Sequence, residues 1–241
     1  MEFGVDEAGR GPVLGSLFVA AVRAAPTALP AGIGDSKRLS PARREGLAAD
    51  LRADDRVETA VVEVTPAAID DPETGLNALT ATAAAEAIAE LFGDAPVAAN
   101  GTGRGADEAA RAGGDRVAER RAGRPTGVVD ACDVDAERFG RRIAEQTSTD
   151  VEVVAEHGAD ESHEVVGAAS VVAKVARDTH IERLAVEHGA VGSGYPSDPH
   201  TRAFLAEYVR EHGDLPPFAR ASWQTSRDVL AAAEQSSLGA F

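Results

Sequence analysis

The chain has 241 residues, 44% of them hydrophobic, and a single cysteine, Cys132. This size suits one large domain or two small ones, and a lone cysteine excludes an internal disulfide and a cysteine-based zinc site. No apolar run approaches the ~18 residues that span a membrane, and the N-terminus lacks a signal-peptide pattern. We therefore expect a cytoplasmic protein with no membrane partner.

The charge of the chain favours a salt-rich environment. The net charge of −16 at pH 7 alone argues against a nucleic-acid partner. However, only Lys37 and Lys174 are lysines among 24 cationic residues, and aromatic residues make up 4%. This composition is typical of a protein kept soluble in concentrated salt. At about 1 M salt the Debye length is only ~3 Å, so a negative surface repels a polyanion little beyond contact.

Residues 1–22 predict two strands joined by a glycine turn. The first apolar run ends in Asp6 and Glu7, and Gly9-Arg10-Gly11 forms the turn. Neighbouring strand residues face opposite ways, so the two acids should diverge unless the strand ends there, as the glycines indicate. Bare backbone at the two glycines allows close approach to a ligand. A metal-binding acid beside a ligand-binding turn and a plain acidic hairpin are both open at this point.

Helical and strand patterns alternate along the rest of the chain. Residues 93–126, rich in Gly, Ala, Arg and acids, are typical of a flexible surface insertion, and a phosphate-binding loop at 101–105 is less favoured because no apolar strand precedes it. The interleaved pattern predicts an α/β sheet with helices packed on it. Periodicity and capping residues predict helices over 41–52, 76–92, 165–188, 200–212 and 226–234, and a helix through 146 that Asp133 or Asp135 caps. They also predict strands over 57–64, 127–130 and 151–155.

Acidic residues follow three apolar strands, at Asp6-Glu7, Asp130 and Asp160. Carboxylates gathered at one edge of a sheet repel one another unless a cation lies between them, and Mg²⁺ and Mn²⁺ prefer such oxygen ligands. Taken singly, each aspartate is more typical of a helix cap or a solvated loop. Asp133 is the alternative to Asp130, and we interpret it as a helix cap because it precedes the helical pattern.

Five segments of the chain resemble type 2 ribonuclease H (ribonuclease HII), especially its archaeal branch. They occur in the family's order and cover most of residues 1–225. The resemblance implies an α/β ribonuclease H-like fold, a mixed central sheet flanked by helices with a helical C-terminal extension. It implies a catalytic domain over 1–225 and a C-terminal helix and tail over 226–241. The segments are DEAGRGPVLGS (6–16), DSKRLS (35–40), VVDACDVDAERFG (128–140), EHGADESHEVVGAASVVAKVARD (156–178) and GSGYPSDPHT (192–201).

The resemblance further implies a metal-dependent endonuclease. Such an enzyme hydrolyses the RNA strand of RNA·DNA hybrids and cuts 5′ to single ribonucleotides in duplex DNA, leaving a 3′-hydroxyl and a 5′-phosphate. The alternatives are another nuclease of this fold, such as a junction resolvase, and a noncatalytic hybrid- or clamp-binding protein. The catalytic acids implied to bind Mg²⁺ or Mn²⁺ are Asp6, Glu7, Asp130 and Asp160.

The resemblance also implies substrate contacts. The glycine turn would sense the ribose 2′-hydroxyl, which distinguishes RNA from DNA, and an aromatic residue would pack on the sugar. Ser170, Lys174 and Arg177 lie at spacings of four and three on one predicted helix, so they can share a face. A phosphate contact from some of them and an ion pair with Asp178 or the active-site acids are both open. His200 stands where the family often has lysine, so we assign it no phosphate contact. The implied substrate-binding residues are Gly9, Arg10, Gly11, Lys37, Ser170, Lys174 and Tyr195.

The end of the chain carries a separate pattern. Gln235, Leu238 and Phe241 match Q-x-x-L-x-x-F, a truncated form of the sliding-clamp-binding box. Such a segment docks an apolar plug into a groove of its partner. The alternative is an ordinary frayed terminus. We expect clamp binding, because the family often carries such a tail.

Overall fold

The computed structural model describes residues 1–34, 39–93 and 124–238, with side chains of the last range described through residue 235. Within these residues, five strands form a mixed sheet in the order β3-β2-β1-β4-β5. Strands β1, β2 and β3 are antiparallel, whereas β4 runs parallel to β1 and β5 parallel to β4. The predicted mixed α/β sheet is therefore confirmed. The strands are β1 (Glu2–Ala8), β2 (Leu17–Ala24), β3 (Val57–Val64), β4 (Thr126–Asp130) and β5 (Glu152–Glu156).

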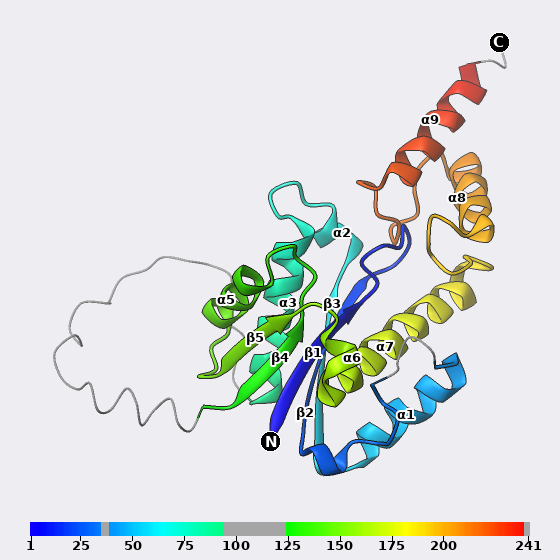
Figure 1. Cartoon of the computed structure of the whole chain (residues 1–241). Helices are drawn as coiled ribbons and strands as arrows, with labels where there is room; N and C mark the ends of the chain where they lie inside the picture. The colour runs from blue at the N-terminus through cyan, green and yellow to red at the C-terminus, as the bar shows by residue number, and fades with distance from the viewer. Residues whose placement is uncertain (35–38, 94–123, 239–241) are drawn as a thin grey trace, which may run out of the picture.

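Helices cover both faces of this sheet (Figure 1). Helices α1 (Pro41–Ala53) and α7 (Glu164–His188) lie on one face, and α3 (Leu76–Leu91) and α5 (Ala136–Gln146) lie on the other. Helices α8 (Pro199–His212) and α9 (Gln224–Leu238) extend away from the sheet as a C-terminal pair. No helix in the described ranges is long and apolar enough to cross a membrane.

The predicted long elements agree with the observed ones to within two residues at each end, except at the C-terminus. There α9 continues to Leu238, four residues beyond the predicted end at 234. Three one-turn elements were not predicted, because a single turn has no period to detect. They are the 3₁₀ helix η1 (Pro26–Ala28) and the α-helices α2 (Pro66–Ile69) and α6 (Ala159–Ser162).

The two faces of β1 bury different neighbours because strand side chains alternate. Phe3 and Val5 join a core with α3 and α5. Gly4 faces α7, where an added Cβ would lie 2.5 Å from the backbone nitrogen of Val166. A residue with any side chain would push α7 away, so this glycine permits the close approach. Asp6, two residues further along β1, shares the face that α7 covers.

The turn after β1 packs against the C-terminal part of the chain rather than against the sheet. Leu14 forms a β-bridge with Ala219, in the segment that joins α8 to α9. The main-chain N–H of Gly15 donates to the carbonyl of Phe218 at 2.8 Å. A third apolar cluster surrounds this contact and fixes the turn to the C-terminal helices: Val13, Leu14, Ile181, Leu184, Val191, Leu205, Phe218 and Ala219.

Some predictions fall outside the described residues. Lys37 lies in the 35–38 gap, and most of the 93–126 insertion lies in the 94–123 gap. The side chain of Leu238 and all of Phe241 are also outside the described part of the chain.

Candidate active site

Three carboxylates meet where β1, β4 and α6 come together. Asp6 lies on β1, Asp130 ends β4 and Asp160 lies on α6. One carboxylate oxygen from each lies within 4.8 Å of the other two. Asp6 and Asp160 are buried. In the described ranges this is the one group of at least three His, Cys, Asp or Glu residues with such spacing. The structure thus brings together three of the four predicted acids.

Donors from the neighbouring helices hold two of these carboxylates. Asp130 Oδ1 accepts from the backbone N–H groups of Gly158 at 2.8 Å and Ala159 at 3.2 Å, at the start of α6. The Ser170 hydroxyl of α7 bonds to the Asp6 carboxylate. Asp130 is therefore fixed by backbone N–H groups at the start of α6. Asp6 is fixed by Ser170 of α7, the helix that approaches β1 closely at Gly4.

The cluster is costly to ionise without a cation. Burial, with a smaller contribution from the Asp130 charge, raises the pKa of Asp6 to about 7 although the hydrogen bond from Ser170 lowers it. Burial, followed by the charge of Asp6, raises the pKa of Glu7 to about 8. Oxygen donors alone, gathered with uncompensated repulsion, suit a hard divalent cation. The residues present therefore fit a divalent metal ion.

Glu7 does not belong to the group of carboxylates that Asp6, Asp130 and Asp160 form. Strand β1 ends at Ala8, one residue beyond Glu7 and directly before Gly9, so both acids are still on the strand and alternation sends Glu7 to the α3 side. Its Oε1 lies 4.0 Å from Arg10 Nε. The charges of Asp6 and Asp130 still raise its pKa, so the four acids remain electrostatically connected. A role for Glu7 as a fourth metal ligand remains a proposal.

The turn at Gly9-Arg10-Gly11 is held by one buried arginine that the sequence analysis missed. Arg220 is fully buried, and its guanidinium donates to the carbonyls of Gly9 at 2.6 Å, Arg10 at 2.9 Å and Gly15 at 2.9 Å. Gly9 has φ of +96°, and an added Cβ would lie 2.8 Å from the carbonyl oxygen of Ser16. The conformation of the turn thus depends on glycine and on Arg220 together.

This arrangement directs main-chain donors outward. In a trans peptide the N–H points opposite to the preceding carbonyl, and the described residues contain no cis bond. Because the Gly9 and Arg10 carbonyls point at Arg220, the N–H groups of Arg10 and Gly11 point away from it. The turn therefore offers two adjacent backbone donors on the side opposite the buried arginine.

Tyr195 lies beside this turn. An added Cβ at Gly11 would be 3.5 Å from the tyrosine ring, and the Val13 N–H donates to the Gly194 carbonyl at 2.8 Å. The guanidinium of Arg177 lies 4.8 Å from the ring centroid, which fixes the ring by a cation–π contact. The tyrosine side chain is 38% exposed. Turn, ring and acid cluster therefore occupy one continuous region.

The family model of ribonuclease HII matches residues 3–100 and 108–226. The chain belongs to the ribonuclease HII family. It is 52% identical over 241 residues to a ribonuclease HII of Haloarcula marismortui, covering 100% of both chains. Members of this family are metal-dependent endoribonucleases. Membership favours this activity over the junction-resolvase and noncatalytic alternatives.

Solved structures support the family fold. The ribonuclease H2 of Pyrococcus horikoshii superposes with a TM-score of 0.78 at 34% identity, covering 97% of this chain and 98% of that chain. An Archaeoglobus fulgidus ribonuclease HII, solved in a complex with PCNA, gives 0.74 at 35% identity, covering 95% and 96%. The predicted ribonuclease H-like fold is confirmed.

Of the two predicted caps of α5, Asp135 is the observed one, and the interpretation of Asp133 as the cap is wrong. Asp135 caps α5, accepting from the Arg138 N–H at 2.9 Å. Asp133 is buried outside the ribonuclease HII acid cluster, and its Oδ1 accepts from the Arg138 guanidinium at 2.9 Å. The expected cap lies two residues too early because two aspartates with the same spacing pattern precede the helix. Asp130, as predicted, is the acid that faces the cluster.

Ser170 and Lys174 differ from the expected phosphate contacts. Ser170 is fully buried, so its hydroxyl has no exposed surface for a substrate phosphate. It bonds to Asp6 and accepts from Lys174 Nζ at 2.8 Å. The Lys174 charge lowers the pKa of Asp6. Ser170 therefore contacts an acid of the cluster and Lys174 contacts Ser170, while a phosphate contact of Lys174 stays a prediction.

The Arg10 side chain forms hydrogen bonds within the protein. Its guanidinium donates to Asn77 Oδ1 at 2.6 Å and Thr80 Oγ1 at 2.8 Å on α3, and to Cys132 Sγ at 3.2 Å. Burial raises the pKa of Cys132 to about 12, so the thiol stays protonated at neutral pH. Arg10 thus anchors the ribonuclease HII turn to α3.

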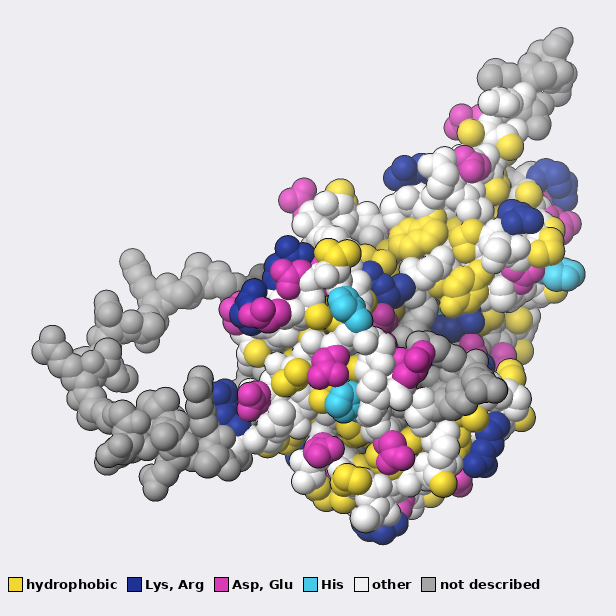
Figure 2. Space-filling model, in the orientation of Figure 1, with side chains coloured by type: hydrophobic (Ala, Val, Ile, Leu, Met, Phe, Trp, Pro, Cys, Tyr) yellow, Lys and Arg dark blue, Asp and Glu magenta, His cyan; other side chains and the backbone are white. Residues whose placement is uncertain are grey.

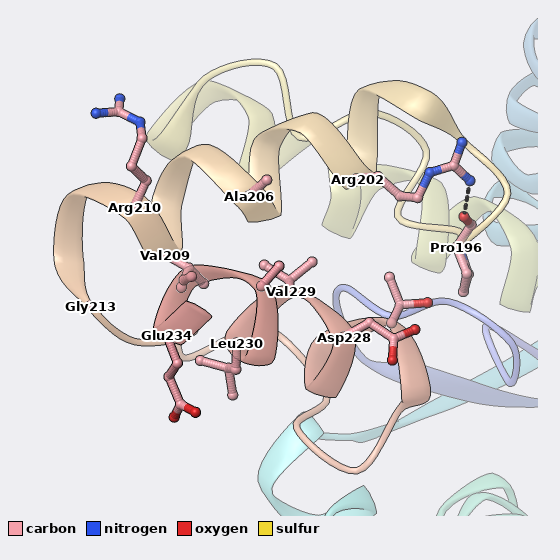
Figure 3. Close-up of a pocket in the computed structure, with 13 residues that line it drawn as sticks. Pro196, Arg202, Ala206, Val209, Arg210, Gly213, Asp228, Val229, Leu230 and Glu234 are labelled. Carbon is pink, nitrogen blue, oxygen red and sulfur yellow. Dashed lines mark hydrogen bonds between the residues drawn. The ribbon is translucent and has the colours of Figure 1, made fainter. Parts of the chain in front are cut away.

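A cavity of about 980 Å³ lies between α8 and α9, and Figure 3 shows Val209 and Val229 lining it. None of the predicted active-site acids lines it. Figure 2 shows hydrophobic side chains gathered around the segment that joins α8 to α9, with acidic and basic groups scattered over the rest of that face. The cavity between α8 and α9 is therefore separate from the acid cluster.

The raised pKa of Asp6 predicts how the metal-free enzyme responds to pH. A carboxyl with a higher pKa in the folded than in the unfolded chain holds its proton more tightly when folded, so the free energy of unfolding falls as pH rises. For Asp6, the free energy of unfolding should fall between pH 3.8 and a pH of about 7. Asp6→Asn removes this fall, so without divalent ions this variant should melt above wild type at pH 8 and close to it at pH 4.

Thermal denaturation at constant high salt with a chelator measures this difference. Asp50 is an exposed acid on α1, and Asp50→Asn is the matched control. The difference in melting temperature between Asp50→Asn and wild type should not grow with pH. Added Mg²⁺ should raise the wild-type melting temperature at pH 8 more than that of Asp6→Asn. A gap between Asp6→Asn and wild type that stays constant from pH 4 to pH 8 would contradict the electrostatic account.

Proposed function

We propose that this chain cuts the RNA strand of RNA·DNA hybrids, and the phosphodiester 5′ to a single ribonucleotide in duplex DNA. The products are a 3′-hydroxyl and a 5′-phosphate. One observation carries the proposal: Asp6, which belongs to the acid cluster with Asp130 and Asp160, lies on β1, and β1 leads directly into the turn that Arg220 holds. A cation site for a phosphate therefore adjoins backbone donors for the neighbouring sugar.

Mg²⁺ or Mn²⁺ is the proposed cofactor, held by Asp6, Asp130 and Asp160 with Glu7 at the margin. When bound, such an ion supplies the charge that activates an attacking water and stabilises the leaving oxygen. The chain itself fixes the carboxylates through Ser170 and the N–H groups that begin α6. Burial keeps competing water away from these oxygens.

Selection of the ribose is proposed to rest on the turn and on Tyr195. A 2′-hydroxyl can accept from the outward N–H groups of Arg10 and Gly11, and a deoxyribose leaves them unpaired. The tyrosine ring, held by Arg177, offers a flat apolar face for the sugar. Lys37 is proposed to contact phosphate on the evidence of its motif alone.

Cleavage of three matched duplexes tests the proposal. They carry no ribonucleotide, one ribonucleotide, or a full RNA strand, and each is assayed with Mg²⁺ and with Mn²⁺ at low and high salt. We expect cutting of the second and third duplexes and none of the first. Equal cutting of the all-DNA duplex would reject ribose selection, and no metal-dependent cutting of any duplex would reject the nuclease.

We also propose that residues 1–225 act as the catalytic unit of a cytoplasmic enzyme, and that 226–241 bind a sliding clamp through Gln235, Leu238 and Phe241. Two observations support the clamp proposal: the motif itself and the PCNA complex of the Archaeoglobus relative. Helix α9 reaches Leu238, so the motif begins on a helix rather than on a tail.

Deleting residues 235–241 should weaken clamp binding at least about tenfold, because short docked segments concentrate binding energy in a few apolar anchors. Calorimetric titration of the purified clamp measures this. The control is Ser236→Ala with Ser237→Ala, which alters the motif's spacer positions and should leave affinity intact. Unchanged affinity after the deletion would remove the tail from the interface.

A further inference from the structure

A carboxylate outside the active site holds the segment that carries Arg220. Asp70 follows α2, in the connection between β3 and α3. Its Oδ2 accepts from the Ala221 N–H at 2.6 Å, and its Oδ1 accepts from the Ser222 N–H at 2.9 Å. The Ser222 hydroxyl also donates to Oδ1. Three donors from two consecutive residues thus converge on one carboxylate about 150 positions away in sequence.

These two residues directly follow Arg220, so Asp70 fixes the backbone from which the buried arginine extends. The far side of the segment is fixed separately, since the Arg220 N–H donates to the Val13 carbonyl at 2.8 Å. The charge of Asp70 also favours the charged form of the Arg220 guanidinium, against the burial that lowers its pKa to about 10. Asp70 therefore acts on both the position and the charge of Arg220.

The same segment carries Trp223, which links it to the turn a second time. The indole Nε1–H donates to the Gly11 carbonyl at 3.3 Å. The Arg220 guanidinium lies 4.9 Å from the indole centroid. The carbonyls of Gly9, Arg10 and Gly11 are therefore all bonded from a segment whose other anchor is Asp70.

We propose that Asp70 is a positioning residue for ribose-dependent cleavage, acting through Arg220 and Trp223 on the turn at Gly9–Gly11. This inference rests on the proposed function, because it assigns the turn the task of reading the sugar. If Asp70 is lost, the segment shifts and the outward N–H groups of the turn lose their alignment with the 2′-hydroxyl. Asp70 itself touches neither the acids nor, by this account, the substrate.

Fluorescence of the sole tryptophan gives a test that does not depend on activity. Asp70→Asn replaces one acceptor oxygen by an amide that faces N–H donors, so Trp223 should become more accessible to acrylamide quenching. The matched control is Asp71→Asn, an exposed neighbour whose Oδ1 accepts from Glu73 N–H within its own turn. Asp71→Asn makes the same charge change and should leave the quenching constant at the wild-type value.

Cleavage of the one-ribonucleotide duplex by the full-length chain gives the second readout. Asp70→Asn should lower kcat about tenfold, since small misplacements of a reacting geometry have effects of this size. KM and the melting temperature should change less than kcat. In an Arg220→Lys background the same substitution should lower kcat by less than about twofold, because residues that act through one contact are not additive.

Each outcome decides the proposal. Increased quenching with a non-additive loss of kcat supports it. It is overturned if Asp70→Asn matches Asp71→Asn in both readouts, or if its effect adds fully to that of Arg220→Lys. Should Asp70→Asn fail to fold, Ser222→Ala removes one exposed donor and must give a smaller shift in the same direction, and no shift rejects the proposal. A wild type that cuts none of the duplexes refutes the proposed function, whereas an active wild type with unaffected Asp70→Asn refutes this inference alone.

Discussion

Asp160→Asn is expected to abolish metal-dependent cleavage, with a fall in kcat on the order of 10³-fold or more. The substitution keeps the shape of a buried side chain and removes one of three clustered charges. A divalent cation then loses a charged ligand, while the surfaces that contact the duplex are unchanged. Cleavage of the one-ribonucleotide duplex, paired with duplex binding measured in chelator, separates these effects.

Asp133→Asn is the matched control for that experiment. Asp133 is also a buried aspartate of the same region, but it pairs with Arg138 and lies outside the cluster. Its substitution should change kcat by less than about threefold while affecting stability modestly. Full activity of Asp160→Asn, or equal losses in both variants, would show that the three-acid cluster is not the reaction centre.

The positions of the acids were predictable because each follows an apolar strand, and strand periodicity is local. That the acids converge in space was harder to predict. Val5 pairs with Val129, which places Asp6 next to Asp130 on parallel neighbouring strands. The paired residues Val5 and Val129 lie more than 120 positions apart in sequence, and no local pattern states which strands pair. Only the resemblance to a family implied that these acids share one site.

The supports of the turn were not predictable for a different reason. Arg220 acts on backbone carbonyls, and a carbonyl has no sequence signature because every residue carries one. The available signal was one arginine among small and aromatic residues between Phe218 and Trp223. Likewise, Ser170 was predicted to contact a phosphate. Helical spacing shows which residues share a face of a helix, but it does not show what packs against that face, and Ser170 is buried.

Arg220→Met is expected to be the most damaging change outside the acid cluster. It keeps the length of the side chain but leaves the carbonyls of Gly9, Arg10 and Gly15 without their donor. Three lost charge-assisted bonds in a buried place predict a fall of about 3 kcal/mol in the free energy of unfolding. With the turn released, kcat on the one-ribonucleotide duplex should fall about 10²-fold even well below the melting temperature.

Arg227→Met makes the same chemical change on the exposed surface of α9 and serves as the control, with wild-type stability and kcat expected. Arg220→Lys sharpens the test. Lysine keeps the charge but lacks the planar fork that reaches three carbonyls, so it should recover part of the stability and little of the kcat. If lysine restored both in full, the charge of Arg220 would matter and its geometry would not. The turn would then owe its shape to Gly9 and the surrounding apolar cluster rather than to hydrogen bonds from Arg220.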